Sequence, residues 1–81
     1  MLRNPKVLVI EDDAQQARYF QLLLNRYEPP FQVDLASDAP EAIEKLANNQ
    51  YDVLTIDYNL PSMTGIDLLI QIKKKYMHTK T

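Results

Sequence analysis

The sequence predicts an α/β domain built on a parallel sheet. Three short apolar runs alternate with three segments of helical periodicity, an order typical of parallel strands joined by right-handed crossovers. The apolar runs cover residues 7–10, 31–35 and 53–56, and the helical segments cover residues 14–27, 39–47 and 66–76. The first and third runs end in carboxylates, and neighbouring parallel strands would bring these groups together at one edge of the sheet.

The composition is that of one small globular domain. The chain has 81 residues, of which 46% are hydrophobic and 25% are charged. A net charge of −2 provides no basic face for nucleic acid, and the absence of cysteine excludes disulfides and thiolate zinc sites. The apolar run that follows Pro5 is too short for a signal peptide or a membrane span, so we expect a cytoplasmic protein with no membrane partner.

The first strand and helix have strong local signals. Residues 7–10 are all apolar and β-branched at three of four positions, which suits a central strand buried on both faces. Asp13 is placed to cap the following helix. The expected buried stripe of that helix consists of Ala17, Phe20, Leu23, Leu24 and Tyr27. The sequence Glu28-Pro29-Pro30 should end it.

The second strand and helix are predicted from alternation and from a capping pattern. Apolar residues alternate with polar ones over 31–35, as expected for an edge strand with one buried face. Asp38 and Glu41 then resemble a capping box, with Asp38 as the N-cap and Pro40 in the first turn. The helix should end at Asn48-Asn49-Gln50.

The third strand, 53–56, is predicted to be fully buried, and a loop over 57–65 follows it. In that loop Pro61 should stiffen the chain, and Gly65 should provide either a positive φ or a close backbone approach. The stripe expected on the third helix consists of Ile66, Leu69, Ile72 and Tyr76. The basic residues 73–75 should complement the dipole of its last turns.

The acidic residues predict a cation site. Carboxylates that meet at one sheet edge repel one another and raise each other's pKa, so a positive charge is needed to offset them. A hard divalent cation prefers oxygen ligands, and Mg²⁺ is the usual one near phosphates.

Two motifs carry a resemblance to a known family. Residues 7–13 read Val-Leu-Val-Ile-Glu-Asp-Asp, and residues 57–65 read Asp-Tyr-Asn-Leu-Pro-Ser-Met-Thr-Gly. This pair resembles the receiver domain of bacterial two-component response regulators, which has an acidic pair after its first strand and an aspartate after its third. The resemblance covers essentially the whole chain. It implies a flavodoxin-like, doubly wound parallel sheet with the ligand crevice at the carboxyl ends of strands 1 and 3.

The resemblance also implies specific roles in a phosphorelay. Asp57 would be the phosphoacceptor, and a sensor histidine kinase or histidine phosphotransfer protein would be the donor. Asp12 would bind Mg²⁺ directly, Glu11 would act mostly through metal-bound water, and Asp57 and the backbone carbonyl of Asn59 would complete the ligands. Phosphorylation would switch an output module, so the domain would be a signalling receiver and not an enzyme.

Compared with the family, residues 1–81 are expected to be a truncated receiver, the (βα)₃ portion of a (βα)₅ domain. The segment that would supply a phosphate-sensing Ser or Thr and a phosphate-binding Lys is missing. The third strand should therefore have an unpaired edge, which favours a homodimer or a strand-exchanged oligomer. We expect His78 to be a solvated residue of the polar tail.

Two other functions remain open at this point. One is a phosphate-independent interaction module that keeps the acidic pocket without the switch. The other is a Mg²⁺-dependent phosphohydrolase with an aspartate nucleophile, suggested by the Asp57-Tyr58-Asn59 sequence after a strand. That class requires a second acid where this chain has Asn59.

Overall fold

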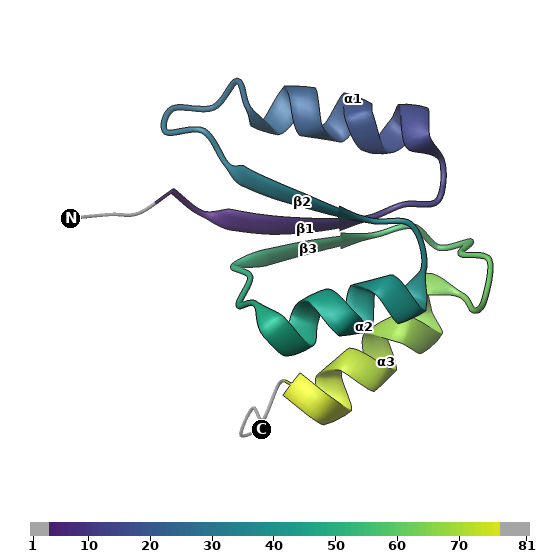
Figure 1. The fold of residues 1–81 in the computed structure, drawn as a ribbon. Helices are drawn as coiled ribbons and strands as arrows, with labels where there is room; N and C mark the ends of the chain where they lie inside the picture. The colour runs from purple at the N-terminus through teal and green to yellow at the C-terminus, as the bar shows by residue number, and fades with distance from the viewer. Residues whose placement is uncertain (1–3, 77–81) are drawn as a thin grey trace.

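Three strands and three helices alternate along the chain in the computed structural model, which describes residues 4–76 (Figure 1). The elements are β1 (Lys6–Ile10), α1 (Ala14–Leu24), β2 (Gln32–Ala36), α2 (Ala39–Asn48), β3 (Val53–Ile56) and α3 (Gly65–Tyr76). The strands form one parallel sheet in the order β2-β1-β3, which confirms the predicted topology. His78 lies outside the described residues. Over residues 4–76, no helix has the length and apolar character needed to cross a bilayer.

The register of the sheet aligns the ends of its strands. Ile10, the last residue of β1, pairs with Ala36 on β2 and with Ile56 on β3. The residues that follow β1 and β3 therefore leave the sheet at the same level. This register is what brings Glu11 and Asp57 to a common edge.

Helices cover both faces of the sheet. α1 lies on one face, and α2 and α3 lie on the other (Figure 1). The central strand β1 is the most deeply buried element, since Val7, Leu8, Val9 and Ile10 are each no more than 1% exposed. The prediction of a strand buried on both faces is therefore confirmed for 7–10.

β3 is less buried than the sequence suggested. Val53 is 44% exposed, and the other three residues of the strand are only half-buried. The reason is positional: β3 lies at the edge of the sheet and, among the described residues, pairs only with β1. The prediction of a fully buried strand is wrong, whereas the prediction of an unpaired edge is confirmed.

α1 begins as predicted and ends earlier. The Asp13 carboxylate accepts hydrogen bonds from the backbone N–H groups of Gln15 (2.9 Å) and Gln16 (3.3 Å), so Asp13 is the N-cap. The helix ends at Leu24, where the expected end was Tyr27. Tyr27 is exposed and packs edge-on against the ring of Phe31, with 5.4 Å between the ring centroids.

The predicted capping box at the start of α2 is wrong. Asp38 is the N-cap, but its carboxylate makes no capping hydrogen bond to the helix. It accepts instead from the backbone N–H (3.3 Å) and hydroxyl (3.0 Å) of Ser62, in the loop before α3. Glu41 accepts from the N–H and hydroxyl of Ser37, both at 2.8 Å. The two carboxylates therefore bind different parts of the chain.

α3 packs on a face that only partly matches the predicted stripe. Ile72, which was predicted to be buried, is 2% exposed and lies in the core with Leu68 (0%), whereas Ile66 (54%) and Leu69 (42%) are exposed. Helix α3 begins at Gly65, whose backbone lies close to the carbonyl group of Asp57 after the strand end. The lysines 73–75 lie in the last turn, as predicted.

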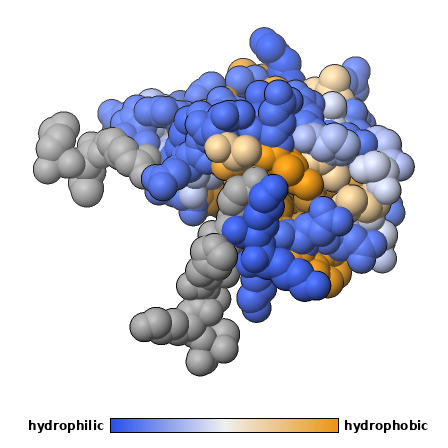
Figure 2. All heavy atoms as spheres, turned by 60° about the horizontal axis from the view of Figure 1, so that its bottom comes forward, coloured by the Kyte–Doolittle hydropathy of each residue, from blue (hydrophilic) through white to orange (hydrophobic). Residues whose placement is uncertain are grey.

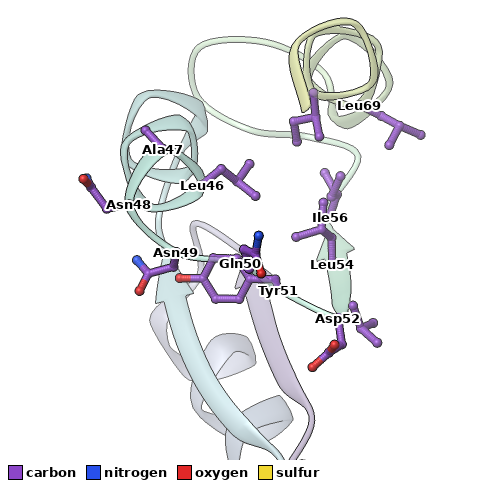
Figure 3. A pocket seen from close by; sticks show the side chains of 12 residues that line it. Leu46, Ala47, Asn48, Asn49, Gln50, Tyr51, Asp52, Leu54, Ile56 and Leu69 are labelled. Atoms are coloured by element: carbon purple, nitrogen blue, oxygen red, sulfur yellow. The ribbon is translucent and has the colours of Figure 1, made fainter. Parts of the chain in front are cut away.

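Exposed apolar side chains gather on the side of the molecule that α2 and α3 form (Figure 2). A groove of about 1030 Å³ runs there between the end of α2, β3 and α3. Leu46 points from α2 towards β3, and Leu69 projects from α3 on the side away from α2 (Figure 3). None of the acidic residues that follow β1 and β3 lines this groove.

A polar cluster joins the strands at their opposite ends. The Tyr51 hydroxyl donates to Asp34 at 2.6 Å, and the Lys6 ammonium donates to the side chain of Asn49 at 3.0 Å. The same ammonium lies 4.0 Å from the Asp34 carboxylate and 5.2 Å from the centroid of the Tyr51 ring. Burial, followed by the hydrogen bond and charge of Asp34, raises the pKa of Tyr51 well above its usual value.

Candidate functional site

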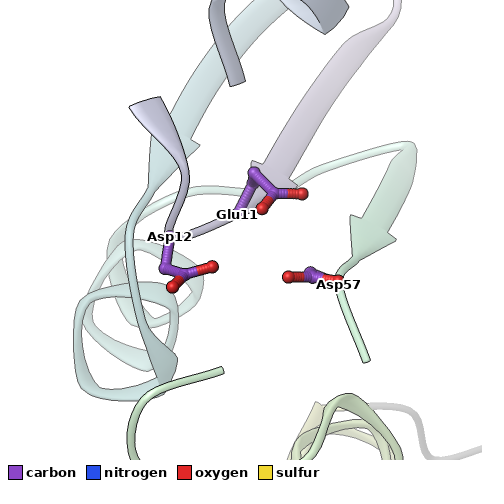
Figure 4. A group of neighbouring side chains, drawn as sticks. All are labelled: Glu11, Asp12 and Asp57. Carbon is purple, nitrogen blue, oxygen red and sulfur yellow. The ribbon is translucent and has the colours of Figure 1, made fainter. Parts of the chain in front are cut away.

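Three carboxylates meet at the C-terminal edge of the sheet. Glu11 and Asp12 follow β1, Asp57 follows β3, and one oxygen from each lies within 4.8 Å of the others (Figure 4). The backbone fixes their positions, because the N–H of Glu11 donates to Ala36 O at 2.9 Å and the N–H of Asp57 donates to Ile10 O at 3.0 Å. The sheet's own hydrogen bonding thus holds two of the three acids.

The cluster is electrostatically unfavourable by itself. Burial raises the pKa of Glu11 above its usual value of 4.5. The hydrogen bond that its carboxylate accepts from the Asp13 N–H, at 3.3 Å, lowers the pKa of Glu11. The charge and hydrogen bonding of Asp57 and the charge of Asp12 raise this pKa further. A cation bound between the carboxylates would remove the repulsion. The donor set consists of carboxylate oxygens alone, which fits a hard ion such as Mg²⁺ or Ca²⁺.

Asn59 is the fourth predicted site residue, and its relation to the acids is less direct. It is exposed, lies two residues beyond Asp57, and forms an isolated antiparallel bridge with Thr64. The N–H of Leu60 donates to Met63 O at 3.2 Å within the same turn. The structure therefore brings Glu11, Asp12 and Asp57 together, and places Asn59 in the loop that leaves the cluster.

Gly65 closes this loop. Its N–H donates to Tyr58 O at 2.6 Å. A Cβ atom at position 65 would clash with the carbonyl oxygen of Asp57 and would lie 3.0 Å from Cγ2 of Ile56. The φ angle of Gly65 is not positive, so of the two roles predicted for it, the close approach is confirmed and the positive φ is wrong.

Other side chains also line the site. A pocket of about 280 Å³ beside Glu11 and Asp57 includes Tyr58, the neighbour of Asp57 in the sequence, and Gln16 and Phe20 from α1, which the sequence did not suggest as site residues. Gln16 and Phe20 are four residues apart and share one face of α1. That spacing was a usable signal, but Phe20 was assigned to the core; it is 38% exposed.

Comparison with known proteins agrees with the fold. The family model described as the response regulator receiver domain matches residues 7–81. The chain is 32% identical over 69 residues to the response regulator ArlR of Staphylococcus saprophyticus, and the match covers 85% of this chain and 30% of ArlR. A CheY-like receiver domain from Methylobacillus flagellatus superposes with a TM-score of 0.85 at 28% identity, over 98% of this chain and 65% of that one.

A third relative has been solved with ligands. The response regulator TrrA of Thermotoga maritima, in complex with Mg²⁺ and BeF, has a TM-score of 0.81 and 25% identity, over 89% of this chain and 61% of that one. The chain thus spans about a third of ArlR and less than two thirds of either solved chain.

The parallel α/β sheet and its structural matches define the class as a flavodoxin-like domain. The chain belongs to the response regulator receiver family. This confirms the resemblance seen in the two motifs. Receiver domains act in phosphorelay signalling and interact with histidine kinases in two-component systems.

Proposed function

We propose that this domain accepts a phosphoryl group on Asp57 from a sensor histidine kinase or a histidine phosphotransfer protein, and that the modification switches an output module. The observation that carries the proposal is the meeting of Glu11, Asp12 and Asp57 within 4.8 Å. Asp57 is half-buried and opens into the 280 Å³ pocket, which leaves room for a phosphoryl group beside its carboxylate. The domain, residues 1–81, would be the first part of a receiver and would act in the cytoplasm with its kinase.

In the proposed reaction an Asp57 oxygen attacks the phosphorus atom of a phosphohistidine. A P–O bond forms as the P–N bond breaks, and the histidine nitrogen keeps the electron pair and takes up a proton. Transfer of this kind depends mainly on positioning and on stabilisation of charge. The hydrogen bond from the Asp57 N–H to Ile10 O holds the backbone of the nucleophile, and Phe20 and Tyr58 line the pocket beside it.

Mg²⁺ is the proposed cofactor. Asp12, Asp57 and the backbone carbonyl of Asn59 would hold it directly, and Glu11 would hold it through water. When bound, it would neutralise the carboxylates and the charge of the incoming phosphoryl oxygens. The TrrA complex with Mg²⁺ and BeF supports this assignment by analogy. The domain itself would be a signalling receiver whose only chemistry is its own phosphorylation.

The test is intact mass spectrometry after incubation with acetyl phosphate, with and without Mg²⁺. We expect a gain of one phosphoryl group that requires Mg²⁺ and disappears in Asp57→Asn. Asp67→Asn is the matched control, because Asp67 is an exposed acid outside the cluster. If the chain binds Mg²⁺ but gains no phosphoryl group from any donor, the phosphate-independent interaction module becomes the better assignment. Turnover of a generic phosphate ester would instead favour a phosphohydrolase.

A further inference from the structure

The side chain of Asp38 does not form the capping hydrogen bond that its position before α2 suggests. Its backbone is extended, with φ −161° and ψ 175°, and its carbonyl accepts the Ala42 N–H at 3.0 Å, so α2 starts normally. Its carboxylate makes no capping bond to the helix. Both of its side-chain bonds to other residues instead come from Ser62, 24 residues away in the chain. The carboxylate is therefore used to hold a loop.

The loop that it holds is the one that leaves Asp57. Its base is closed by the Gly65 N–H bond to Tyr58 O, and its middle is anchored by Leu60, which is 8% exposed and belongs to the core cluster. Ser62 lies at the tip, next to Pro61. The bonds to Asp38 are the attachment of this tip to the β2–α2 turn. With base, middle and tip fixed, the peptide groups between Tyr58 and Ser62 have little freedom to rotate.

The electrostatics of Asp38 are consistent with this attachment. Burial raises its pKa, but the nearby Ala39 N–H dipole and the hydrogen bonds from the hydroxyl and N–H of Ser62 outweigh that effect and leave the pKa below its usual value of 3.8. The carboxylate is therefore ionised at neutral pH, and bonds to an ionised acceptor are stronger than neutral ones.

We infer that Asp38 is a positioning residue for the proposed metal site, acting through Ser62 to aim the backbone carbonyl of Asn59. This inference rests on the proposed function, because the Asn59 carbonyl matters only if the cluster binds a cation. Groups that orient metal ligands from the outer shell commonly contribute as much to affinity as a weak ligand does. Since Asp38 and Ser62 lie near the surface, their loss should change the metal site more than it changes folding.

The experiment compares Asp38→Ala with Asp38→Asn by titrating each chain with MgCl₂ and following amide chemical shifts. Both changes remove the charge, but asparagine keeps an oxygen that can accept from Ser62. We expect Asp38→Ala to raise the Mg²⁺ dissociation constant roughly 10-fold, the lower end of such outer-shell effects, and Asp38→Asn to stay near wild type. Ser62→Ala, which loses one of the two bonds, should fall between them.

Glu41→Gln is the charge control, since Glu41 lies on the same turn but its carboxylate binds Ser37. It should leave the dissociation constant unchanged. Hydrogen exchange of residues 58–64 gives a second readout and should accelerate in Asp38→Ala but not in Asp38→Asn.

Equal Mg²⁺ affinity in Asp38→Ala and wild type would overturn the positioning role and leave the proposed function standing. Equal weakening of Mg²⁺ binding in Asp38→Ala and Asp38→Asn would also overturn the positioning role, because the loss of charge alone would then explain the effect. Failure of the wild-type chain to bind Mg²⁺ at all would instead refute the proposed function, and the inference with it.

Discussion

The backbone of Gly65 lies directly against the carbonyl group of Asp57, so close that a Cβ atom would clash with that oxygen. The first turn of α3 and the end of β3 are therefore in contact across the loop that joins them. We predict that Gly65→Ala forces these elements apart and lowers the free energy of unfolding by about 1–3 kcal/mol, the usual effect of overpacking. Urea denaturation would measure it, with Gln71→Ala on the exposed face of α3 as the control. A Gly65→Ala chain of unchanged stability would contradict the close approach.

Glu11 should make the metal-free protein sensitive to pH. Its pKa is raised in the folded state, mainly by burial, so the folded state binds its proton more tightly than the unfolded state does. Between the usual value of 4.5 and the raised value, stability therefore falls as pH rises. We predict that Glu11→Gln stabilises the metal-free chain at pH 7 by about 0.5–1 kcal/mol, the scale of partly exposed charge interactions, and by less near pH 4.5.

Thermal melts with a chelator, run across this pH range, would show the effect as a difference in Tm between the two chains. With saturating Mg²⁺ at pH 7, the wild-type chain should have the higher Tm, because glutamine removes a charge that attracts the cation. A constant difference at every pH would mean that Glu11 titrates alike in the folded and unfolded chains.

A substitution at Tyr51 tests the polar cluster at the opposite end of the sheet from the acidic site. Tyr51→Phe removes the 2.6 Å hydrogen bond to Asp34 and leaves the ring in place. We predict a loss of roughly 1 kcal/mol in the free energy of unfolding, typical of one hydrogen bond to a partly exposed charged partner. The Mg²⁺ dissociation constant should not change, because the cluster of Lys6, Asp34 and Tyr51 lies at the other ends of the strands. A changed Mg²⁺ affinity would show that the two ends are coupled.

One edge of β3 pairs with no strand among residues 4–76, and this edge should make the 81-residue chain associate with itself. The edge carries exposed Val53, and exposed Leu69 lies above the same groove. Unpaired apolar edges favour pairing with another strand, and a charged residue on the edge discourages it. Light scattering over a concentration series should show a rising mass for the wild-type chain and a lower one for Val53→Lys. A wild-type chain that stays a monomer at every concentration would refute the prediction.

The sequence predicted what short-range patterns determine. The apolar run 7–10 suited a strand buried on both faces, and Asp13 had the position and the side chain of an N-cap. The meeting of Glu11 and Asp57 followed from parallel pairing alone, and the sheet register confirms it.

The wrong predictions concern choices made between segments distant in sequence. Ile66 and Leu68 are both apolar residues of α3, and the helix sequence alone does not reveal that Leu68 is buried while Ile66 is exposed. Asp38 and Glu41 matched a local capping motif, but Ser62, far along the chain, competes for the Asp38 carboxylate. Val53 looked as buried as Leu8 because apolarity does not reveal whether a strand is central or at an edge.

The bonds from Glu11 to Ala36 and from Asp57 to Ile10 have a thermodynamic consequence for the whole domain. They join all three strands just where the carboxylates lie, and separating β3 from β1 also separates Asp57 from Glu11 and Asp12. A cation held by these acids can bind only when β1 and β3 are paired, and its binding energy therefore stabilises that pairing. At a free concentration ten times its dissociation constant, such a cation would raise the free energy of unfolding by about 1.4 kcal/mol. The chemistry of the site and the integrity of the sheet would then respond together to the concentration of one ion.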